Sequence, residues 1–234
     1  MGATPPWVRI PHLPPLIIDL QNFSFKVKLI MKKILTIIFL CFMWSHTVLA
    51  AGIEDFEIEG ISVGDSLLKY YSEKDIKKII DKKQKYKDKS FVRGAICSKD
   101  NPQTFCKKVR GDFDTYDAIQ FHFKKNDPEY KLFMISGIMD FIDDINACQT
   151  EKLKTTSELE NLFPNADKKS EEKKHPSDKK KKSIVYTSYF YLNDGSASRV
   201  QCYDWSKKLG YPDHLKVTLD HPDYIDWMKN KAYK

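Results

Sequence analysis

An apolar run near the amino terminus sets the conditions under which this chain folds. Met31-Lys32-Lys33 supplies a basic start, the eleven residues 34–44 are apolar except for one threonine, and Val48 and Ala50 occupy the minus-three and minus-one positions of a cleavage site. This pattern predicts a secretory signal peptide over residues 31–50, cleaved after Ala50. We therefore expect the remainder to fold as a periplasmic or secreted protein in an oxidising compartment.

Residues 1–30 and the end of the apolar run leave two alternatives open. The first 30 residues hold five prolines and no coherent periodicity, so we interpret them as a mis-assigned upstream extension, with translation starting at Met31. A genuine cytoplasmic tail is the alternative, and it would favour an uncleaved anchor. The stretch 34–51 is eighteen residues long and includes Ser45, His46 and Thr47, which places it at the lower limit for a spanning helix. We expect membrane contact only if the signal stays uncleaved.

The composition of residues 51–234 argues against a nucleic-acid-binding protein. The whole chain has 39 Lys and Arg against 32 Asp and Glu; five and one of these precede residue 51, which leaves 34 against 31, a net charge of +3. Such a small excess of positive charge gives only a weak electrostatic attraction for nucleic acid. Only Arg93, Arg110 and Arg199 remain for bidentate phosphate contacts. The 184 residues are enough for one domain with a sizeable core.

Four cysteines remain after the predicted cleavage, and an even number in an exported chain indicates two disulfides with three possible pairings. We favour Cys97 with Cys106, which would close a short polar loop, and Cys148 with Cys202, which would join a helix to a strand. A four-cysteine metal site is the alternative, but the spacings lack the close pairs typical of zinc ligands. We therefore expect no metal and no cofactor.

The hydrophobic pattern predicts an α+β fold, in which a single domain has an antiparallel sheet of about five strands packed by short helices. Asp65 and Ser72 are candidate N-caps of two early helices. A later helix is expected from near Phe141 through Cys148, and another after a capping box at Ser157. The strands are expected at 117–123, 130–138, 184–192, 198–203 and 215–219, followed by a terminal helix at 224–234.

Alternation within these strands also predicts which side chains face the core. Ile119, Phe121 and Phe123 alternate with Gln120 and His122, so His122 is expected on a solvated face. Val200 and Cys202 share the inward face of a later strand. We expect the first two strands to form an antiparallel hairpin, and the turn at 193–195 to connect a second one.

The segment 167–182 is the clearest boundary within the predicted domain. It holds eight lysines and four acidic residues, with no apolar side chain. Because such a stretch cannot bury anything, it is predicted to be a disordered charged loop. A tether for acidic partners or anionic lipid is the functional alternative, although the acidic residues weaken its field.

Known catalytic motifs give little guidance. The sequence contains no phosphate loop, dinucleotide fingerprint, zincin helix or EF-hand loop. Ser62 lies between Gly60 and Gly64 as in a nucleophile elbow, but no convincing buried strand precedes it, so a helix-entry turn is the better interpretation. His122 or His214 could serve as a general base if an acidic partner and a nucleophile lay nearby.

Tyr203, Asp204 and Trp205 form the most site-like cluster. Aromatic rings beside a carboxylate can bind a sugar or a cation, so these three residues are a candidate ligand platform. The alternative is that the rings simply close one end of the sheet.

The stretch 53–68 (IEDFEIEGISVGDSLL) resembles the opening of uncharacterised exported proteins from AT-rich marine alphaproteobacteria, with weaker similarity around Tyr203-Asp204-Trp205. That resemblance implies no activity, cofactor or catalytic residue. The layout is also similar, in architecture only, to small periplasmic modules in which a glycine-bounded entry precedes two helices and an antiparallel sheet, as in outer-membrane assembly factors and lactamase-inhibitory proteins.

Two function classes follow from the sequence. The leading hypothesis is a noncatalytic periplasmic or envelope binding module that uses its sheet face for an envelope protein or a small ligand. A small periplasmic hydrolase is the alternative. It requires His122, His214 or Asp204 to converge on a pocket that holds a nucleophile.

Overall fold

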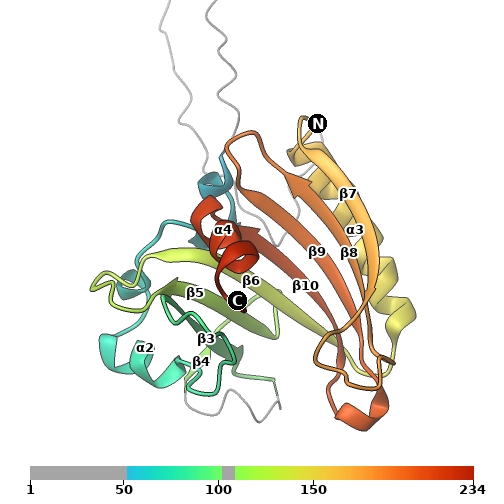
Figure 1. Cartoon of the computed structure of the whole chain (residues 1–234), viewed down its shortest axis with the longest axis horizontal. Helices are drawn as coiled ribbons and strands as arrows, with labels where there is room; N and C mark the ends of the chain where they lie inside the picture. The colour runs from blue at the N-terminus through green and yellow to red at the C-terminus, as the bar shows by residue number, and fades with distance from the viewer. Residues whose placement is uncertain (1–51, 102–108) are drawn as a thin grey trace, which may run out of the picture. The chain divides into compact units, whose positions relative to one another are not determined.

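A computed structural model describes residues 52–101 and 109–234, and its main feature is an eight-stranded sheet (Figure 1). The predicted signal peptide and Cys106 lie outside the described residues. Along the sheet the strands are ordered β4-β3-β5-β6-β10-β9-β8-β7, and every neighbouring pair is antiparallel except β3 with β4. In chain order the strands are β3 (Phe91–Ser98), β4 (Arg110–Gly111), β5 (Ala118–Lys124), β6 (Leu132–Phe141), β7 (Asp167–Lys174), β8 (Ile184–Tyr191), β9 (Ala197–Asp204) and β10 (Asp213–Asp220).

The remaining elements pack around this sheet. A two-stranded hairpin, β1 (Glu57–Ile58) with β2 (Ile61–Ser62), precedes the short helix α2 (Glu73–Ile79). The long helix α3 (Ile145–Leu162) follows β6, and α4 (Pro222–Asn230) follows β10. Ser72 caps α2, because its hydroxyl accepts a hydrogen bond from the backbone N–H of Asp75, as the capping signal predicted.

One face of the sheet forms the main core. Helix α3 packs against β9 and β10, and the β1-β2 hairpin packs against β6. Ile119, Val200 and Leu215 lie on this face and are fully buried. Cys148 of α3 and Cys202 of β9 form a disulfide, which is the pairing expected from the sequence, and it ties the helix to the sheet. Cys97 is also disulfide-bonded.

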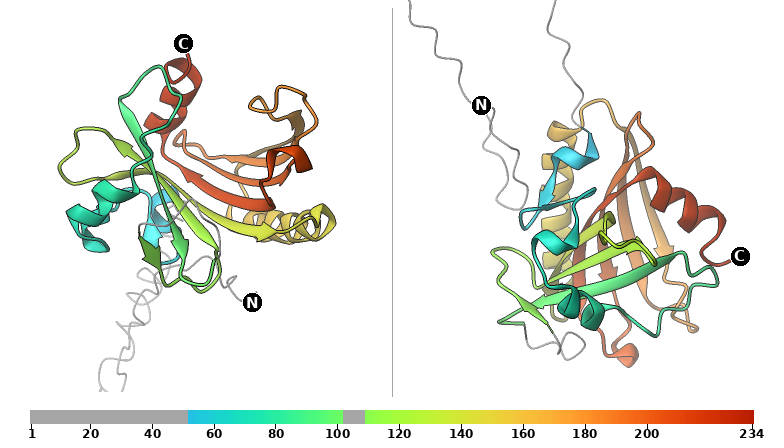
Figure 2. Two further views of the ribbon diagram at one scale, coloured as in Figure 1. Left: turned by 90° about the horizontal axis from the view of Figure 1, so that it is seen from below. Right: turned by 90° about the vertical axis from the view of Figure 1, so that its left-hand side faces the viewer.

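We call the opposite side of the sheet the open face, because α4 is the helix that lies against it and it covers only one end (Figure 2). Tyr224 and Trp227 of α4 pack there against Phe91 and Met134. His122, expected on a solvated face, is fully buried beneath α4, and its Nε2 lies 3.0 Å from the hydroxyl of Tyr86. The strand alternation was right, but a helix distant in sequence covers that end of the face.

The α+β class is confirmed, whereas the expectation of about five strands is wrong, since the sheet has eight. Strands β3, β4 and β7 were missed. The two helices expected between Phe141 and Phe163 are one helix of 18 residues, in which Ser157 is an interior residue rather than a cap. Phe141 belongs to the preceding strand.

The predicted charged loop at 167–182 is wrong over its first half. Residues 167–174 form β7, an edge strand paired along its length with β8. Backbone hydrogen bonds to an apolar partner strand hold this segment, so its own side chains need not be buried. Lys and Glu side chains on an outer edge also discourage pairing with a further strand.

Candidate functional site

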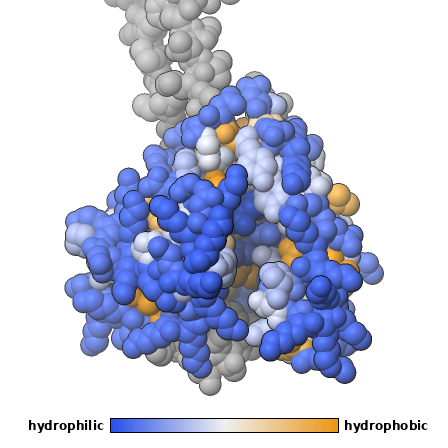
Figure 3. Space-filling model, viewed as in Figure 1, coloured by the Kyte–Doolittle hydropathy of each residue, from blue (hydrophilic) through white to orange (hydrophobic). Residues whose placement is uncertain are grey.

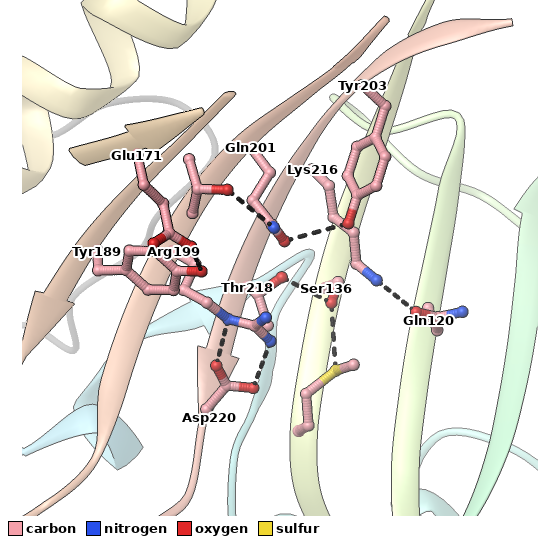
Figure 4. Close-up of polar contacts among 12 residues, drawn as sticks. Gln120, Ser136, Glu171, Tyr189, Arg199, Gln201, Tyr203, Lys216, Thr218 and Asp220 are labelled. Carbon is pink, nitrogen blue, oxygen red and sulfur yellow. Dashed lines mark hydrogen bonds and ion pairs between the residues drawn. The ribbon is translucent and has the colours of Figure 1, made fainter. Parts of the chain in front are cut away.

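The open face is hollowed beside α4 (Figure 3). The hollow lies over β6, β10 and β9, between α4 and the strands β8 and β7 at the edge of the sheet. Because alternate residues of a strand point to the same side, the side chains of these strands that face away from α3 line it. On this side of the sheet, strands β5 to β10 carry a group of polar side chains, of which Ser136, Gln201, Thr218 and Asp220 are buried and lie beneath the hollow. The group consists of Gln120, Ser136, Glu171, Tyr189, Arg199, Gln201, Tyr203, Lys216, Thr218 and Asp220 (Figure 4).

Lys216 occupies the centre of this lining. It lies on β10, with Ile138 of β6 and Gln201 of β9 as its direct neighbours in register. Its ammonium donates a hydrogen bond to the side-chain oxygen of Gln120, and the side chain keeps part of its surface exposed. Burial, reinforced by the positive charges of Arg199 and Arg93, lowers the pKa of Lys216 to about 7. The site therefore holds a lysine whose charge is costly without a partner.

Arg199 and Arg93, two arginines of the open face, have carboxylate partners of their own. Arg199 binds Asp220 in a bidentate ion pair, with its Nε 2.6 Å and its terminal nitrogen 2.9 Å from the two carboxylate oxygens. Burial alone would lower the pKa of Arg199, but the Asp220 carboxylate raises it on balance, so the guanidinium stays charged. Arg93 pairs with Asp81. Neither arginine is therefore left to bind a ligand without losing a carboxylate partner.

Hydroxyl and amide groups connect the rest of the lining. The hydroxyls of Ser136 and Thr218, which are opposite each other on the paired strands β6 and β10, lie 3.0 Å apart, and both residues are fully buried. Gln201 donates to Thr187 at 3.2 Å, while the Tyr203 hydroxyl donates to the amide oxygen of Gln201 at 3.3 Å. These bonds fix the orientation of side chains that face the hollow.

Toward the edge of the sheet the lining ends in a charged group. The Tyr189 hydroxyl donates to Glu171 of β7 at 2.8 Å, and the ammonium of Lys173 lies 2.8 Å from the same carboxylate. Hydrogen bonds from Lys173 and then Tyr189 lower the pKa of Glu171 to about 2. The carboxylate of this group is thus neutralised within the edge strands.

Aromatic rings close the end of the hollow opposite α4. The rings of Tyr203 and His214 are stacked with centroids 4.5 Å apart, and Trp205 stacks on Tyr203 at 5.8 Å. His175, from the loop after β7, lies 4.4 Å from Trp205. Asp204 does not join them, because it is the next residue of β9 after Tyr203 and points to the other face. The predicted platform of Tyr203, Asp204 and Trp205 is therefore aromatic only.

The residues nominated for catalysis do not come together. His122 is level with Asp220 in the sheet register and His214 is six residues away along β10, so about 20 Å separates them. Burial lowers the pKa of His122 well below its usual value and that of His214 to about 4, so both rings are neutral near pH 7. Ser62 lies in the β1-β2 hairpin and not in a strand-to-helix elbow.

No family model, curated protein or solved structure matches this chain. Across residues 52–101 and 109–234, no group of three or more His, Cys, Asp or Glu side chains is placed to hold a metal ion. The same residues include no helix that is long and apolar enough to span a membrane.

The sequence contained a partial signal for this site. Lys216 and Thr218 alternate in sequence with Leu215, Val217 and Leu219, a pattern that places both on the side of a strand away from the core. Alternation cannot show that α4 covers one end of that side and leaves the other hollow. It also cannot bring Gln120 next to Lys216, since 96 residues separate them and the contact depends on the pairing of β5, β6 and β10.

Proposed function

We propose that this protein is an exported, noncatalytic binding module that holds a small ligand in the hollow of its open face. The observation that carries the proposal is the convergence of polar side chains from neighbouring central strands on one recess. Burying such groups at the middle of a sheet costs free energy unless they are fully paired. Here the polar groups are paired with one another, but the ammonium of Lys216 has only a neutral amide as its partner. A recess with a few oriented polar groups and one such charge is more typical of a binding site than of a core.

The shape of the open face favours a small ligand over a protein partner. The hollow is enclosed by α4, by the aromatic end at Trp205 and by the edge strands, so a flat protein surface would not reach Lys216 at its floor. A protein partner remains an alternative for the exposed parts of the chain. The unpaired edge of β7 is charged along its length, which disfavours addition of a further strand.

A hydrolase is supported less well. Within the parts of the chain that the structure describes, no Ser, Thr or Cys side chain forms a hydrogen bond with a histidine. Such a pair is the usual way to activate a hydroxyl or thiol nucleophile. The histidines at the two ends of the open face also carry lowered pKa values, which weakens them as bases near pH 7.

Export is supported by the cysteines. The bond between Cys148 and Cys202, together with a bonded Cys97, fits an oxidising compartment better than the cytoplasm. The proposed signal peptide predicts a mature protein that begins at Ala51. Sequencing the amino terminus of protein from an export-competent bacterium tests this, and recovery of the intact chain in the inner membrane would favour the anchor.

The binding proposal is tested by ligand capture. Residues 51–234 are incubated with a small-molecule extract of bacterial envelopes, separated from free compounds by gel filtration, denatured, and the released compounds are identified by mass spectrometry. We expect at least one compound to be enriched. Ile138→Trp should abolish the enrichment, because a large ring opposite Lys216 would fill the hollow. Lys85→Met, an exposed surface change, is the matched control and should keep it. If Ile138→Trp captures as much of the compound as the wild type does, the hollow is not the binding site.

A further inference from the structure

Within the part of the chain that the structure describes, Lys216 has no carboxylate counterion on the open face. Arg199 and Arg93 are paired with Asp220 and Asp81. Among the described residues no carboxylate lies within 4.0 Å of the Lys216 ammonium, whose hydrogen-bond partner is the neutral amide of Gln120. The floor of the hollow therefore carries an uncompensated positive charge whenever Lys216 is protonated.

The hydrogen-bond capacity of Lys216 is also unfilled. An ammonium has three N–H donors and no acceptor, and one of the three is used by Gln120. Because lysine can only donate, this bond also fixes the amide of Gln120 with its oxygen toward Lys216 and its NH2 group away. Gln120 thus acts as a positioning residue that holds the ammonium while two donors stay available.

Among the described residues, no hydrogen bond joins the Lys216 ammonium to a side chain other than Gln120. The Tyr203 hydroxyl lies beside the Lys216 side chain but donates to Gln201, and the Glu171 carboxylate is held at the edge by Lys173 and Tyr189 (Figure 4). The lowered pKa of Lys216 agrees with a cation that lacks a partner. A negatively charged group placed beside Lys216 would supply the missing counterion. It would therefore raise the pKa of Lys216 and favour its protonated form.

We propose that the ligand of the hollow carries a carboxylate or phosphate group, and that Lys216, positioned by Gln120, binds this group. This inference rests on the proposed function and adds the chemical class of the ligand. The two anions share the charge and the oxygen acceptors that the site requires. A ligand with one such group suits the site best, since Lys216 supplies a single ammonium.

The inference is tested on 15N-labelled residues 51–234 by NMR titration with acetate and, in a separate arm, with inorganic phosphate. Both arms are run at pH 7 and at an ionic strength held constant with sodium chloride. We expect saturable shifts of the Gln120 side-chain amide and of the Lys216 backbone amide in at least one arm. Lys216→Met should weaken binding by at least tenfold, because a hydrogen bond to a charged group typically contributes about 1.5–3 kcal/mol. Lys85→Met should bind as the wild type does.

A second readout separates ligand binding from general electrostatics. The pKa of Lys216, followed through its 13Cε resonance, should rise when the anion saturates the site. Shifts that do not saturate, that are equal in Lys216→Met, or that leave this pKa unchanged would overturn the inference. If the compound captured from envelope extract is neutral and still binds Lys216→Met, the ligand class is wrong while the binding function stands. If Ile138→Trp captures the same compound as the wild type, the proposed binding of a ligand in the hollow is wrong.

Discussion

The disulfide between Cys148 and Cys202 should contribute a large share of the stability of this fold. The two residues are 54 positions apart, and both are fully buried. For a loop of this length the chain-entropy model gives a contribution of about 4 kcal/mol, as an upper figure, since strain and residual structure in the unfolded chain reduce it. Free energies of unfolding are typically about 5–15 kcal/mol, so the bond is a substantial part of the total.

The measurement isolates this bond from the second disulfide. Urea unfolding of Cys97→Ala/Cys106→Ala is followed with and without reductant, so that the difference reports only on Cys148 and Cys202. We expect a loss of roughly 2–4 kcal/mol on reduction and a larger m-value, because the reduced chain exposes more surface. A Cys148→Ser change should cost more than reduction alone, since a buried hydroxyl without a partner typically adds about 1–3 kcal/mol.

The comparison with Cys97 provides the control. The pairing of Cys97 with Cys106 would close a loop of nine residues' separation, for which the same model gives about 2.5 kcal/mol. Removing this pair should therefore destabilise the protein less than removing Cys148–Cys202. A loss of less than about 1 kcal/mol on reduction of the double variant would show that the Cys148–Cys202 bond contributes little to stability. Peptide mapping without reductant that links Cys148 to Cys97 or Cys106 would show that the pairing is wrong.

Three further predictions concern the sheet. The free energy of unfolding should rise from pH 7 to 9. The unfolded chain keeps Lys216 protonated over this range, whereas the folded protein, in which the pKa of Lys216 is about 7, releases the proton. Lys216→Met should flatten this pH dependence in urea unfolding. Asp220→Asn should cost about 3 kcal/mol, the lower end for a broken buried pair, because it leaves half-buried Arg199 without a carboxylate, whereas Arg199→Met/Asp220→Leu should recover most of the loss. Gly137→Ala should lower stability by about 1–3 kcal/mol in thermal unfolding, since a Cβ there would lie 2.5 Å from the ring of buried Tyr116.

Strands with strong alternation could be predicted from the sequence alone. The strands at β5, β8, β9 and β10 were placed to within two residues, because β5, β9 and β10 alternate in sequence and β8 is rich in β-branched and aromatic residues. The Asn193-Asp194-Gly195 turn was also placed correctly, with Gly195 at a φ of +86°. In these segments local pattern and tertiary structure agree.

The elements that were missed are those whose structure depends on distant partners. Strand β7 has no apolar residue, and only its pairing with β8 makes it a strand. Helix α3 was divided in two because Ser157 and Glu160 imitate a start signal, yet the helix continues along the sheet through that point. The site depends on the same distant pairing. Its central contact joins Lys216 to Gln120, and neither residue forms part of a recognisable motif.

The most direct test of the account is a crystal structure of residues 51–234 prepared from envelope extract without refolding. We predict electron density for a small molecule above Lys216, with an acidic group within hydrogen-bond distance of the ammonium and Gln120 still in contact with the lysine. Bound density elsewhere on the molecule, with the hollow filled by the protein's own side chains, would show that the open face is not the binding site.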